Sequence, residues 1–504
     1  VNLYRARALM AVGGNAWRTS HNPYRPAIYD TLDRVGVVVW DEARDYTAWN
    51  VDDMAAMVRR DRSHPSVVVW SYCNEIECHQ DPADNTTQMA FRHAAKSNDP
   101  TRPTSYNWVK PATDIIDSGV DVHGISHYDT DTYKSYHTSH PNKPMVSSEC
   151  CSCQTQRGEN NKTSAEVFFT NFAGDCLEQQ VAWSDDLQFV AGTLGVWTLF
   201  DYYGEPQGWP HVSSSFGQFD LTGVAKPHAR WYEAWWKCGG AAMDCVVVSI
   251  VQTWGGETPP TSIDVFTNAP SVRLELNGEI IGTAKAPAAG YASFPNIRFS
   301  PGTLVAVALD KNGHVVANDT QRSPGKAEEL RMVLMAPSEE TGTGTSLVLD
   351  GHDAAIVRVA LVDANGVLAD AAVPVTFTVV EGPGRVLGVG NGDPSNHEHN
   401  QIPSRTSYHG LATAVVGVSI DCTSPLREVI AFIDADSTAT NRTRVMNDCP
   451  SDRYIVVQAD APGLAPAKIN IPVSGDAARH GVLAAASASM ADSKAILRTL
   501  PGLE

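Results

Sequence analysis

The sequence predicts an α/β fold in which a barrel of parallel strands is followed by all-β domains. Up to about residue 240, short runs of β-branched and aromatic residues alternate with segments of helical periodicity. Beyond Cys245 tryptophan becomes rare, and short alternating strands are separated by Gly, Asn and Pro turns. Strands that alternate with helices are typical of a parallel sheet, whereas strands bounded by turns are typical of β-sandwiches.

The N-terminal region supplies its elements in the order that a barrel requires. Val37–Asp41 and Val67–Asn74 are nearly continuous apolar runs, which are typical of parallel strands buried on both faces. The expected strands are Asn15–Ser20, Val37–Asp41, Val67–Asn74, Pro103–Asn107, Val120–Ser126, Pro144–Ser148 and Gly192–Leu199, and the expected helices are Ala27–Val35, Asp52–Arg62, Gln88–Ser97, Glu166–Gln180 and Pro227–Trp236.

The C-terminal region contains clear hairpin signals. Val272–Leu276 is followed by Asn277-Gly278, the strongest short-range signal for a tight hairpin turn. Ala336–Thr345 is rich in Pro, Ser, Glu, Thr and Gly, which is typical of a linker. The expected division is a barrel over 1–240, a β-sandwich over 241–335, an immunoglobulin-like β-sandwich over 336–475 and a tail over 476–504.

Composition excludes several classes of partner. The net charge of −19 argues against binding to nucleic acid or to an anionic membrane surface, and it suits a protein that handles neutral ligands. No apolar run approaches the ~20 residues that a membrane span needs. A homo-oligomer remains an open alternative. The first five residues, Val1–Arg5, have the pattern of the middle of a helix, so we expect a chain truncated at its N-terminus.

Cysteines and glycosylation sequons give a weaker indication of compartment. The ten cysteines are dispersed, unlike the dense framework of a small secreted domain. N-x-[ST] sequons begin at Asn85, Asn161, Asn318 and Asn441, which favours a secretory or extracellular protein. The group Cys150, Cys151 and Cys153 fits no standard zinc spacing, so we expect buried thiols or a disulfide there. We expect no metal and no cofactor.

Two glutamates at strand ends are the strongest chemical signal. Glu75 closes the run that begins at Val67, and Glu149 closes the run Pro144–Ser148. Residues at the carboxyl ends of barrel strands face the same rim, where barrel enzymes carry out catalysis. Two carboxyl groups that face each other across such a rim are the equipment for breaking a glycosidic bond.

The residues around these acids carry a family resemblance. They are the runs Gly14–Pro23 with Arg18-Thr19-Ser20-His21, Tyr29–Gly36, Val39–Glu42, Arg60–Ser66, Asn74-Glu75, Gly195–Tyr202 and Gly204-Glu205-Pro206. Together they resemble the barrel of glycoside hydrolase family 2, and its β-galactosidases in particular.

The resemblance implies a (β/α)8 barrel whose first strand is missing from this chain, followed by sandwich modules that brace it. It implies a retaining hydrolase of terminal β-D-galactosides, with Glu75 as general acid/base and Glu149 as nucleophile. It also implies supporting roles for strand-end acids, and a set of substrate-binding residues. The expected supporting acids are Asp41, Glu42, Glu77 and Glu205, and the expected substrate-binding residues are Asn74, Arg18, His21, Tyr128, Trp197 and Asp201.

Three alternatives stay open at this point. The first is a β-glucuronidase or another exo-glycosidase of family 2. β-Glucuronidases resemble the same barrel, but they carry an Asn-x-Lys motif that the stretch 217–227 lacks, which favours a neutral galactoside. A second alternative is a truncated, non-catalytic carbohydrate-binding protein. A third is an unrelated barrel enzyme that uses the two acids to bind a metal.

Overall fold

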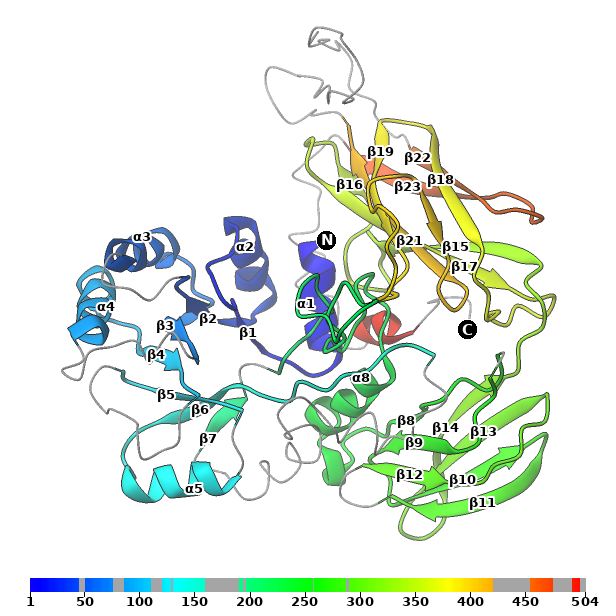
Figure 1. Cartoon of the computed structure of the whole chain (residues 1–504), viewed down its shortest axis with the longest axis horizontal. Helices are drawn as coiled ribbons and strands as arrows, with labels where there is room; N and C mark the ends of the chain where they lie inside the picture. The colour runs from blue at the N-terminus through cyan, green and yellow to red at the C-terminus, as the bar shows by residue number, and fades with distance from the viewer. Residues whose placement is uncertain are drawn as a thin grey trace, which may run out of the picture.

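Figure 1 shows the computed structural model of the chain, in which parallel strands from the N-terminal half lie beside two β-sandwiches. The two sandwiches lie one above the other in this view, and the N-terminal helix stands between them and the parallel strands. The structure describes residues 1–44, 50–75, 86–109, 120–127, 130–158, 190–193, 196–256, 258–286, 290–419, 454–474 and 492–498.

Within these described residues, seven parallel strands follow one another along the chain. The first four form one sheet and the next three another, and a parallel bridge between Trp108 and Ile125 joins the sheets. Each strand thus lies beside its successor, as in a (β/α)8 barrel. The strands are β1 (Ala16–Arg18), β2 (Val38–Glu42), β3 (Val67–Asn74), β4 (Thr104–Asn107), β5 (His123–Ser126), β6 (Met145–Glu149) and β7 (Val190–Thr193).

Helices cover the outer face of these strands. In the second helix, Pro26 occupies the first turn and Gly36 ends the helix at φ 78°, a left-handed conformation that glycine adopts without steric cost. Met54, Val58 and Phe91 of the next two helices pack with Trp70 of β3 in the largest core of this domain. The helices are α1 (Asn2–Ala11), α2 (Pro26–Val35), α3 (Val51–Asp61), α4 (Thr86–Asn98), α5 (Thr130–Ser139) and α8 (Pro227–Tyr232), which the π-helical turn η4 (Glu233–Lys237) continues.

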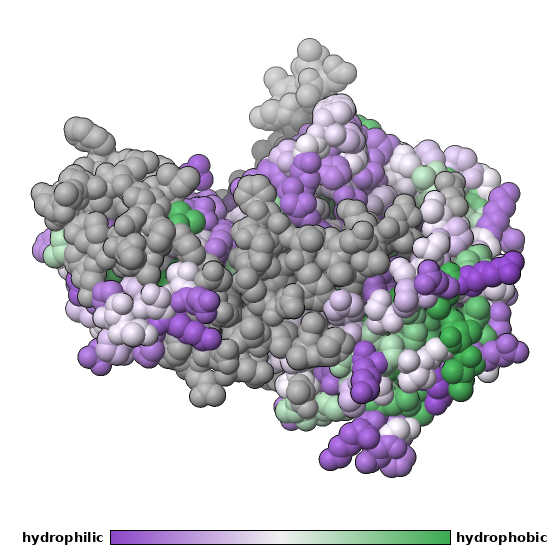
Figure 2. Space-filling model, turned by 60° about the horizontal axis from the view of Figure 1, so that its bottom comes forward, coloured by the Kyte–Doolittle hydropathy of each residue, from purple (hydrophilic) through white to green (hydrophobic). Residues whose placement is uncertain are grey.

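The first sandwich pairs a three-stranded sheet with a four-stranded one. The predicted turn is present: Asn277 and Gly278 both have positive φ, as a type I′ turn requires. Figure 2 shows hydrophobic side chains gathered on one side of the molecule, and the exposed ones of this domain include Ile280 and Val315. The strands are β8 (Val248–Ile250), β9 (Ile263–Thr267) and β12 (Tyr291–Phe294) in one sheet, and β10 (Ser271–Leu276), β11 (Glu279–Lys285), β13 (Thr303–Leu309) and β14 (Val315–Arg322) in the other.

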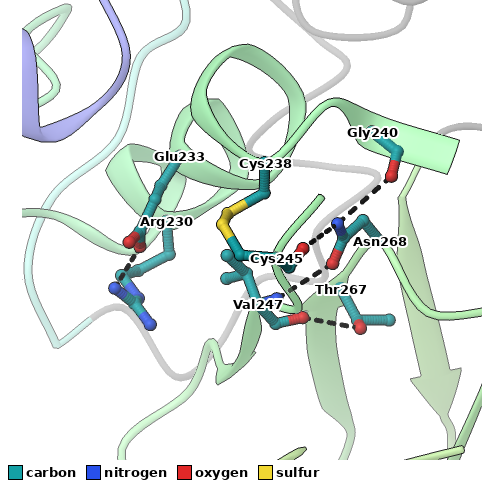
Figure 3. Close-up of a disulfide and its surroundings, with 8 residues drawn as sticks. All are labelled: Arg230, Glu233, Cys238, Gly240, Cys245, Val247, Thr267 and Asn268. Atoms are coloured by element: carbon teal, nitrogen blue, oxygen red, sulfur yellow. Dashed lines mark hydrogen bonds and ion pairs between the residues drawn. A yellow bond between two sulfur atoms is a disulfide. The ribbon is translucent and has the colours of Figure 1, made fainter. Parts of the chain in front are cut away.

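A disulfide closes the junction between the π-helical turn η4 and the first sandwich (Figure 3). Cys238 follows η4 and bonds to Cys245, and the short helix η5 (Gly240–Ala242) lies in the loop between them. Asn268 Nδ2 donates to the carbonyls of Gly240 and Cys245, and Asn268 Oδ1 accepts from Val247 N. This side chain satisfies backbone groups that the turn would otherwise leave buried and unpaired.

The second sandwich contains four and five strands in its two sheets. Its core is rich in valine and alanine, and β17 is buried along its whole length. The strand that precedes the predicted linker at 336–345 pairs with β17, so it belongs to this sandwich. The strands are β15 (Glu329–Ala336), β17 (Ala354–Val362), β21 (Leu411–Val418) and β19 (Gly384–Gly390) in one sheet, and β16 (Leu347–Val348), β23 (Ala467–Ser474), β22 (Tyr454–Asp460), β18 (Pro374–Glu381) and β20 (Ser404–Thr406) in the other.

The C-terminal segment returns to the barrel side of the molecule. The short helix η7 (Asp492–Leu497) buries Ile496 and Leu497 against Tyr4 and Ala8 of α1, so this part of the predicted tail is folded. No helix among the described residues is long and apolar enough to cross a bilayer.

The predicted fold class, an α/β barrel region followed by all-β sandwiches, is confirmed, and two expected elements need comment. The helix expected over Glu166–Gln180 lies outside the described residues. The strand expected over Gly192–Leu199 begins at Val190 and ends at Thr193, and beyond it Val196 forms only an isolated bridge with Cys150.

Candidate active site

The first six parallel strands each end on a polar residue, and these residues meet in one hydrogen-bonded cluster. Because the strands are parallel and sequential, their carboxyl ends form a single rim. A strand that is apolar along its length and polar at its last residue therefore delivers one functional group to that rim. The strand-end residues are Arg18 of β1, Glu42 of β2, Asn74 of β3, Asn107 of β4, Ser126 of β5 and Glu149 of β6.

Glu149 is buried and accepts hydrogen bonds at both carboxylate oxygens. Arg18 Nη1 lies 2.6 Å and Asn107 Nδ2 lies 3.1 Å from Oε2, and His127 Nε2 lies 3.0 Å from Oε1. Burial alone would raise the pKa of this carboxyl, but the His127 hydrogen bond and the Arg18 charge outweigh burial and lower the pKa to about 2. Glu149 is therefore an anion at any physiological pH.

Glu75 follows β3 directly, and its pKa is shifted in the opposite direction to that of Glu149. Burial and the nearby charge of Glu149 raise its pKa, and the hydrogen bond that Ser126 Oγ donates to Oε1 at 2.9 Å only partly offsets this. A Glu75 oxygen, a Glu149 oxygen and a ring nitrogen of His127 lie within 4.8 Å of one another. The two acids are close enough to act on one bond, and their surroundings favour different protonation states.

Backbone conformation places two of these side chains in the cluster. Glu75 has φ 45° and His127 has φ 51°, so both lie in the left-handed region that residues with a side chain rarely adopt. Each residue follows directly after a barrel strand, and this turn directs its side chain to the rim. Such unfavourable conformations cost roughly 1–3 kcal/mol and are concentrated at functional sites.

Arg18 fixes the cluster by contacting several partners at once. Its guanidinium forms two bonds with Glu42, at 3.0 and 2.8 Å, and donates to Asn74 Oδ1 at 2.8 Å. Asn107 Nδ2 also donates to Asn74 Oδ1, at 2.6 Å. With its carbonyl oxygen held in this way, Asn74 keeps its amide nitrogen as the donor for a ligand hydroxyl.

An aromatic group lies beside this cluster. The His21 ring stacks on Trp197 with centroids 5.1 Å apart, and His21 Nδ1 lies 3.1 Å from Glu42 Oε1. Trp197 Nε1 donates to Tyr202 Oη at 2.8 Å, and Tyr202 in turn donates to Glu205. Trp197 is thus an apolar face next to the charged residues, which suits the C–H face of a sugar ring.

Asp201 lies in a buried ion pair with Lys226, whereas the sequence predicted that its carboxylate accepts hydrogen bonds from sugar hydroxyls. Its buried carboxylate accepts from Lys226 Nζ and from the Gly217 amide, both at 2.7 Å to Oδ1. Because Lys226 needs a counter-charge in a site where its side chain is 1% exposed, the carboxylate is used for structure. The predicted Tyr128 lies outside the described residues.

The other predicted site residues come together as expected, and the structure adds further members. Arg18, His21, Asn74, Glu75, Glu149 and Trp197 all lie in or beside the cluster. Among the expected supporting acids, Glu42 holds Arg18, whereas Asp41 is buried against Tyr29, and Glu77 lies outside the described residues. Three members, Asn107, Ser126 and His127, were not predicted, because nothing in the sequence beyond their places at strand ends indicates them.

The cysteine group behind Glu149 forms a disulfide between Cys150 and Cys151. Glu75, His127 and Glu149 also converge closely enough to hold a cation. However, the Arg18 guanidinium 2.6 Å from Glu149 opposes a second positive charge there. The donor set therefore fits carboxylate chemistry better than metal binding.

Comparisons with family models agree with this geometry. Residues 4–48 and 44–182 match the TIM barrel domain of glycosyl hydrolases family 2, and residues 341–420 match C-terminal domain 5 of glycoside hydrolase family 2. Residues 259–317 match a domain of unknown function, DUF4982.

Named relatives and solved structures point to the same family. A β-galactosidase of Bacteroides ovatus is 29% identical over 484 residues, covering 81% of this chain and 55% of that protein. Human β-glucuronidase is 35% identical over 141 residues, covering 25% of this chain and 21% of that protein. A family 2 structure from Bacteroides cellulosilyticus superposes with a TM-score of 0.72 and 26% identity, covering 93% of this chain and 58% of that one.

The chain spans about half the length of the first of these relatives. Two domain models of one family match this chain, the barrel first and the C-terminal domain after it. The rim of strand-end residues agrees with the barrel match. From these observations we conclude that the chain belongs to glycoside hydrolase family 2.

Proposed function

We propose that this chain is the catalytic part of a retaining β-galactosidase. The observation that carries the proposal is the pair of unlike carboxyl groups, Glu75 and Glu149, with oxygens within 4.8 Å of each other. Retaining enzymes hold their two carboxyl groups about 5–5.5 Å apart, whereas inverting enzymes need roughly 6.5–9.5 Å to admit a water.

In the first step the protonated Glu75 donates its proton to the glycosidic oxygen while Glu149 attacks the anomeric carbon. The bond to the leaving alcohol breaks, and an ester forms between Glu149 and the sugar. Arg18 and Asn107 already occupy Oε2, so Oε1, which accepts from His127, keeps a lone pair for the attack. In the second step Glu75, now ionised, takes a proton from water, and the hydroxide displaces Glu149 with net retention.

The surroundings of the two acids support these roles. A general acid must keep its proton near neutral pH, and burial together with the Glu149 charge raises the pKa of Glu75. A nucleophile must stay ionised, and Arg18 and His127 lower the pKa of Glu149. The amide nitrogen of Asn74 is the donor for the sugar 2-hydroxyl, a bond that strengthens in the transition state.

The choice of a neutral galactoside rests on two features. The β-galactosidase of Bacteroides ovatus covers 81% of this chain at 29% identity, more than a putative β-glucuronidase of Formosa agariphila, which covers 69% at 27% identity. Lys226, the lysine in the stretch where glucuronidases carry their Asn-x-Lys motif, is 1% exposed and paired with Asp201. The ammonium group of Lys226 is therefore held by Asp201 and does not bind the carboxylate of a glucuronide.

The test is hydrolysis of nitrophenyl β-galactoside and nitrophenyl β-glucuronide by the purified chain. We expect turnover of the galactoside, a loss of at least roughly a thousandfold in Glu149→Gln, and no change in the surface control Glu279→Gln. Equal rates for the wild type and Glu149→Gln would end the catalytic proposal. Faster turnover of the glucuronide would favour the alternative that human β-glucuronidase represents, and sugar binding without turnover would favour a non-catalytic protein.

We also propose a secretory or extracellular location. Disulfides persist in oxidising compartments, and the described residues include the bridges Cys150–Cys151 and Cys238–Cys245. Thiol counting of the protein isolated from its natural source would test this. A full complement of reduced thiols would contradict it.

A further inference from the structure

We infer that a hairpin over 201–215, together with a loop of the second sandwich, forms a binding subsite for the leaving-group sugar of an oligosaccharide substrate. This inference rests on the proposed function and extends it to the part of the substrate beyond the scissile bond. It assigns the binding of a neutral pyranose to aromatic residues that contact neither Glu75 nor Glu149.

The hairpin presents two aromatic side chains to solvent. Trp209 is 86% exposed and Tyr203 is 56% exposed, and an antiparallel bridge between Tyr203 and Ser213 closes the stem beneath them. Large aromatic rings are usually buried because their exposure to water is unfavourable. A tryptophan held in water at the tip of an ordered hairpin therefore indicates a surface that a ligand covers.

The second sandwich holds this hairpin in place. Val212 N donates to Pro394 O at 2.8 Å, His397 Nε2 bonds to Pro210 O at 2.8 Å, and Asn400 Nδ2 donates to Tyr203 Oη at 2.7 Å. The His397 ring also packs on Trp209, with centroids 4.8 Å apart. Binding would thus need little further ordering of the Trp209 ring, which lowers the entropic cost of association.

The start of the hairpin connects this surface to the catalytic cluster. Tyr202 accepts from Trp197, whose ring stacks on His21, and Tyr202 donates to Glu205 within the hairpin. We therefore place the leaving-group sugar of a ligand held by Trp197 towards the hairpin, because these hydrogen bonds join Trp197 to its first residues. Exposed aromatic faces beside amide and carboxylate groups match a neutral pyranose, which offers a C–H face and equatorial hydroxyls.

The experiment compares two galactosides that differ only on the leaving-group side. A β-galactosyl disaccharide places a sugar at the proposed subsite, whereas β-galactosyl fluoride leaves it empty. We expect Trp209→Ala to lower the ratio of kcat/KM for the disaccharide to kcat/KM for the fluoride by roughly tenfold, and Trp209→Phe to restore most of it. Tyr454→Ala, which removes another exposed aromatic ring (51% exposed), should leave the ratio unchanged.

An unchanged ratio in Trp209→Ala, or the same ratio change in Tyr454→Ala, would overturn the inference. A wild-type chain that hydrolyses neither galactoside would instead overturn the proposed function. In that case the subsite is tested separately by calorimetric titration of the disaccharide. Weaker binding to Trp209→Ala than to the wild type would support it, and equal or undetectable binding would overturn it.

Discussion

Glu75 and Glu149 carry the same functional group, and their neighbours alone make them chemically different. Arg18, Asn107 and His127 stabilise the anion of Glu149, whereas Glu75 receives the Ser126 hydroxyl and faces the negative charge of Glu149. The surroundings of Glu149 lower its pKa, whereas those of Glu75 leave its pKa raised. The protonation state of each acid is therefore decided by the residues at the ends of the neighbouring strands.

The first prediction concerns the alkaline side of the pH–rate profile. Because the proposed general acid, Glu75, must be protonated, kcat/KM should fall as pH rises through its raised pKa. In Glu75→Gln this alkaline limb should disappear when the substrate has a good leaving group, such as dinitrophenolate, which needs no proton. Steady-state kinetics of both proteins between about pH 4 and about pH 9 would show whether the limb disappears. Persistence of the same limb in Glu75→Gln would show that another group titrates.

The second prediction concerns His127, which the sequence did not single out. Its hydrogen bond lowers the pKa of Glu149, so His127→Ala should move the acid limb of the profile to higher pH. Loss of a hydrogen bond to a charged group costs about 1.5–3 kcal/mol, which corresponds to roughly a 10–100-fold fall in kcat/KM. His314→Ala, at an imidazole that is 76% exposed, is the control. An unshifted acid limb in His127→Ala would show that Arg18 alone sets the charge of Glu149.

At the scale of elements, the strands of the barrel were predictable and their mutual contacts were only partly so. A continuous apolar run that ends in Asn74-Glu75 or in Glu149 predicts both the strand and the rim position of its acid. Ser126 and His127 end a weaker run, and their importance comes from the position of β5 beside β6, which no local pattern encodes. The ion pair of Asp201 was missed for a related reason, since its partner Lys226 is 25 residues further along the chain.

The third prediction concerns η7, part of a segment whose Ala- and Ser-rich composition gave no firm structure. Ile496 is fully buried in a core that it shares with Tyr4 and Ala8 of α1, so Ile496→Ala should lower the free energy of unfolding by about 2–4 kcal/mol. Arg498→Ala, at the exposed residue that follows, should change it by less than about 0.5 kcal/mol. Urea unfolding would measure both. Similar values for the two variants would mean that η7 does not dock in solution.

At the scale of the whole molecule, several contacts far apart in sequence attach the second sandwich to the barrel region. Tyr4 Oη of α1 and Arg358 Nη2 of β17 both donate to the carbonyl of Gly223, at 2.8 and 3.1 Å. The hairpin that carries Trp209 packs against the same sandwich. The second sandwich is therefore attached to the barrel region at several points, one of which is the hairpin that carries Trp209.

The last prediction tests this attachment at Arg157. Its guanidinium forms a buried ion pair with Asp220 at 2.6 Å, bonds to the carbonyls of Asn391 and Tyr408 in the sandwich, and lies 5.0 Å from the centroid of the Tyr408 ring. Arg157→Met leaves Asp220 buried without its counter-charge, so it should cost about 3–5 kcal/mol of unfolding free energy.

Asp220→Asn keeps the turn in which Asp220 Oδ1 accepts from Thr222 and Val224, and it removes the charge that Arg157 would otherwise leave unpaired. The double variant Arg157→Met with Asp220→Asn should therefore be less destabilised than the sum of the two single variants, by at least about 1 kcal/mol. Denaturant unfolding of all four proteins measures this coupling. Strictly additive effects would mean that Arg157 and Asp220 are not coupled energetically, and that the loss in Arg157→Met comes from its contacts with Asn391 and Tyr408 of the sandwich.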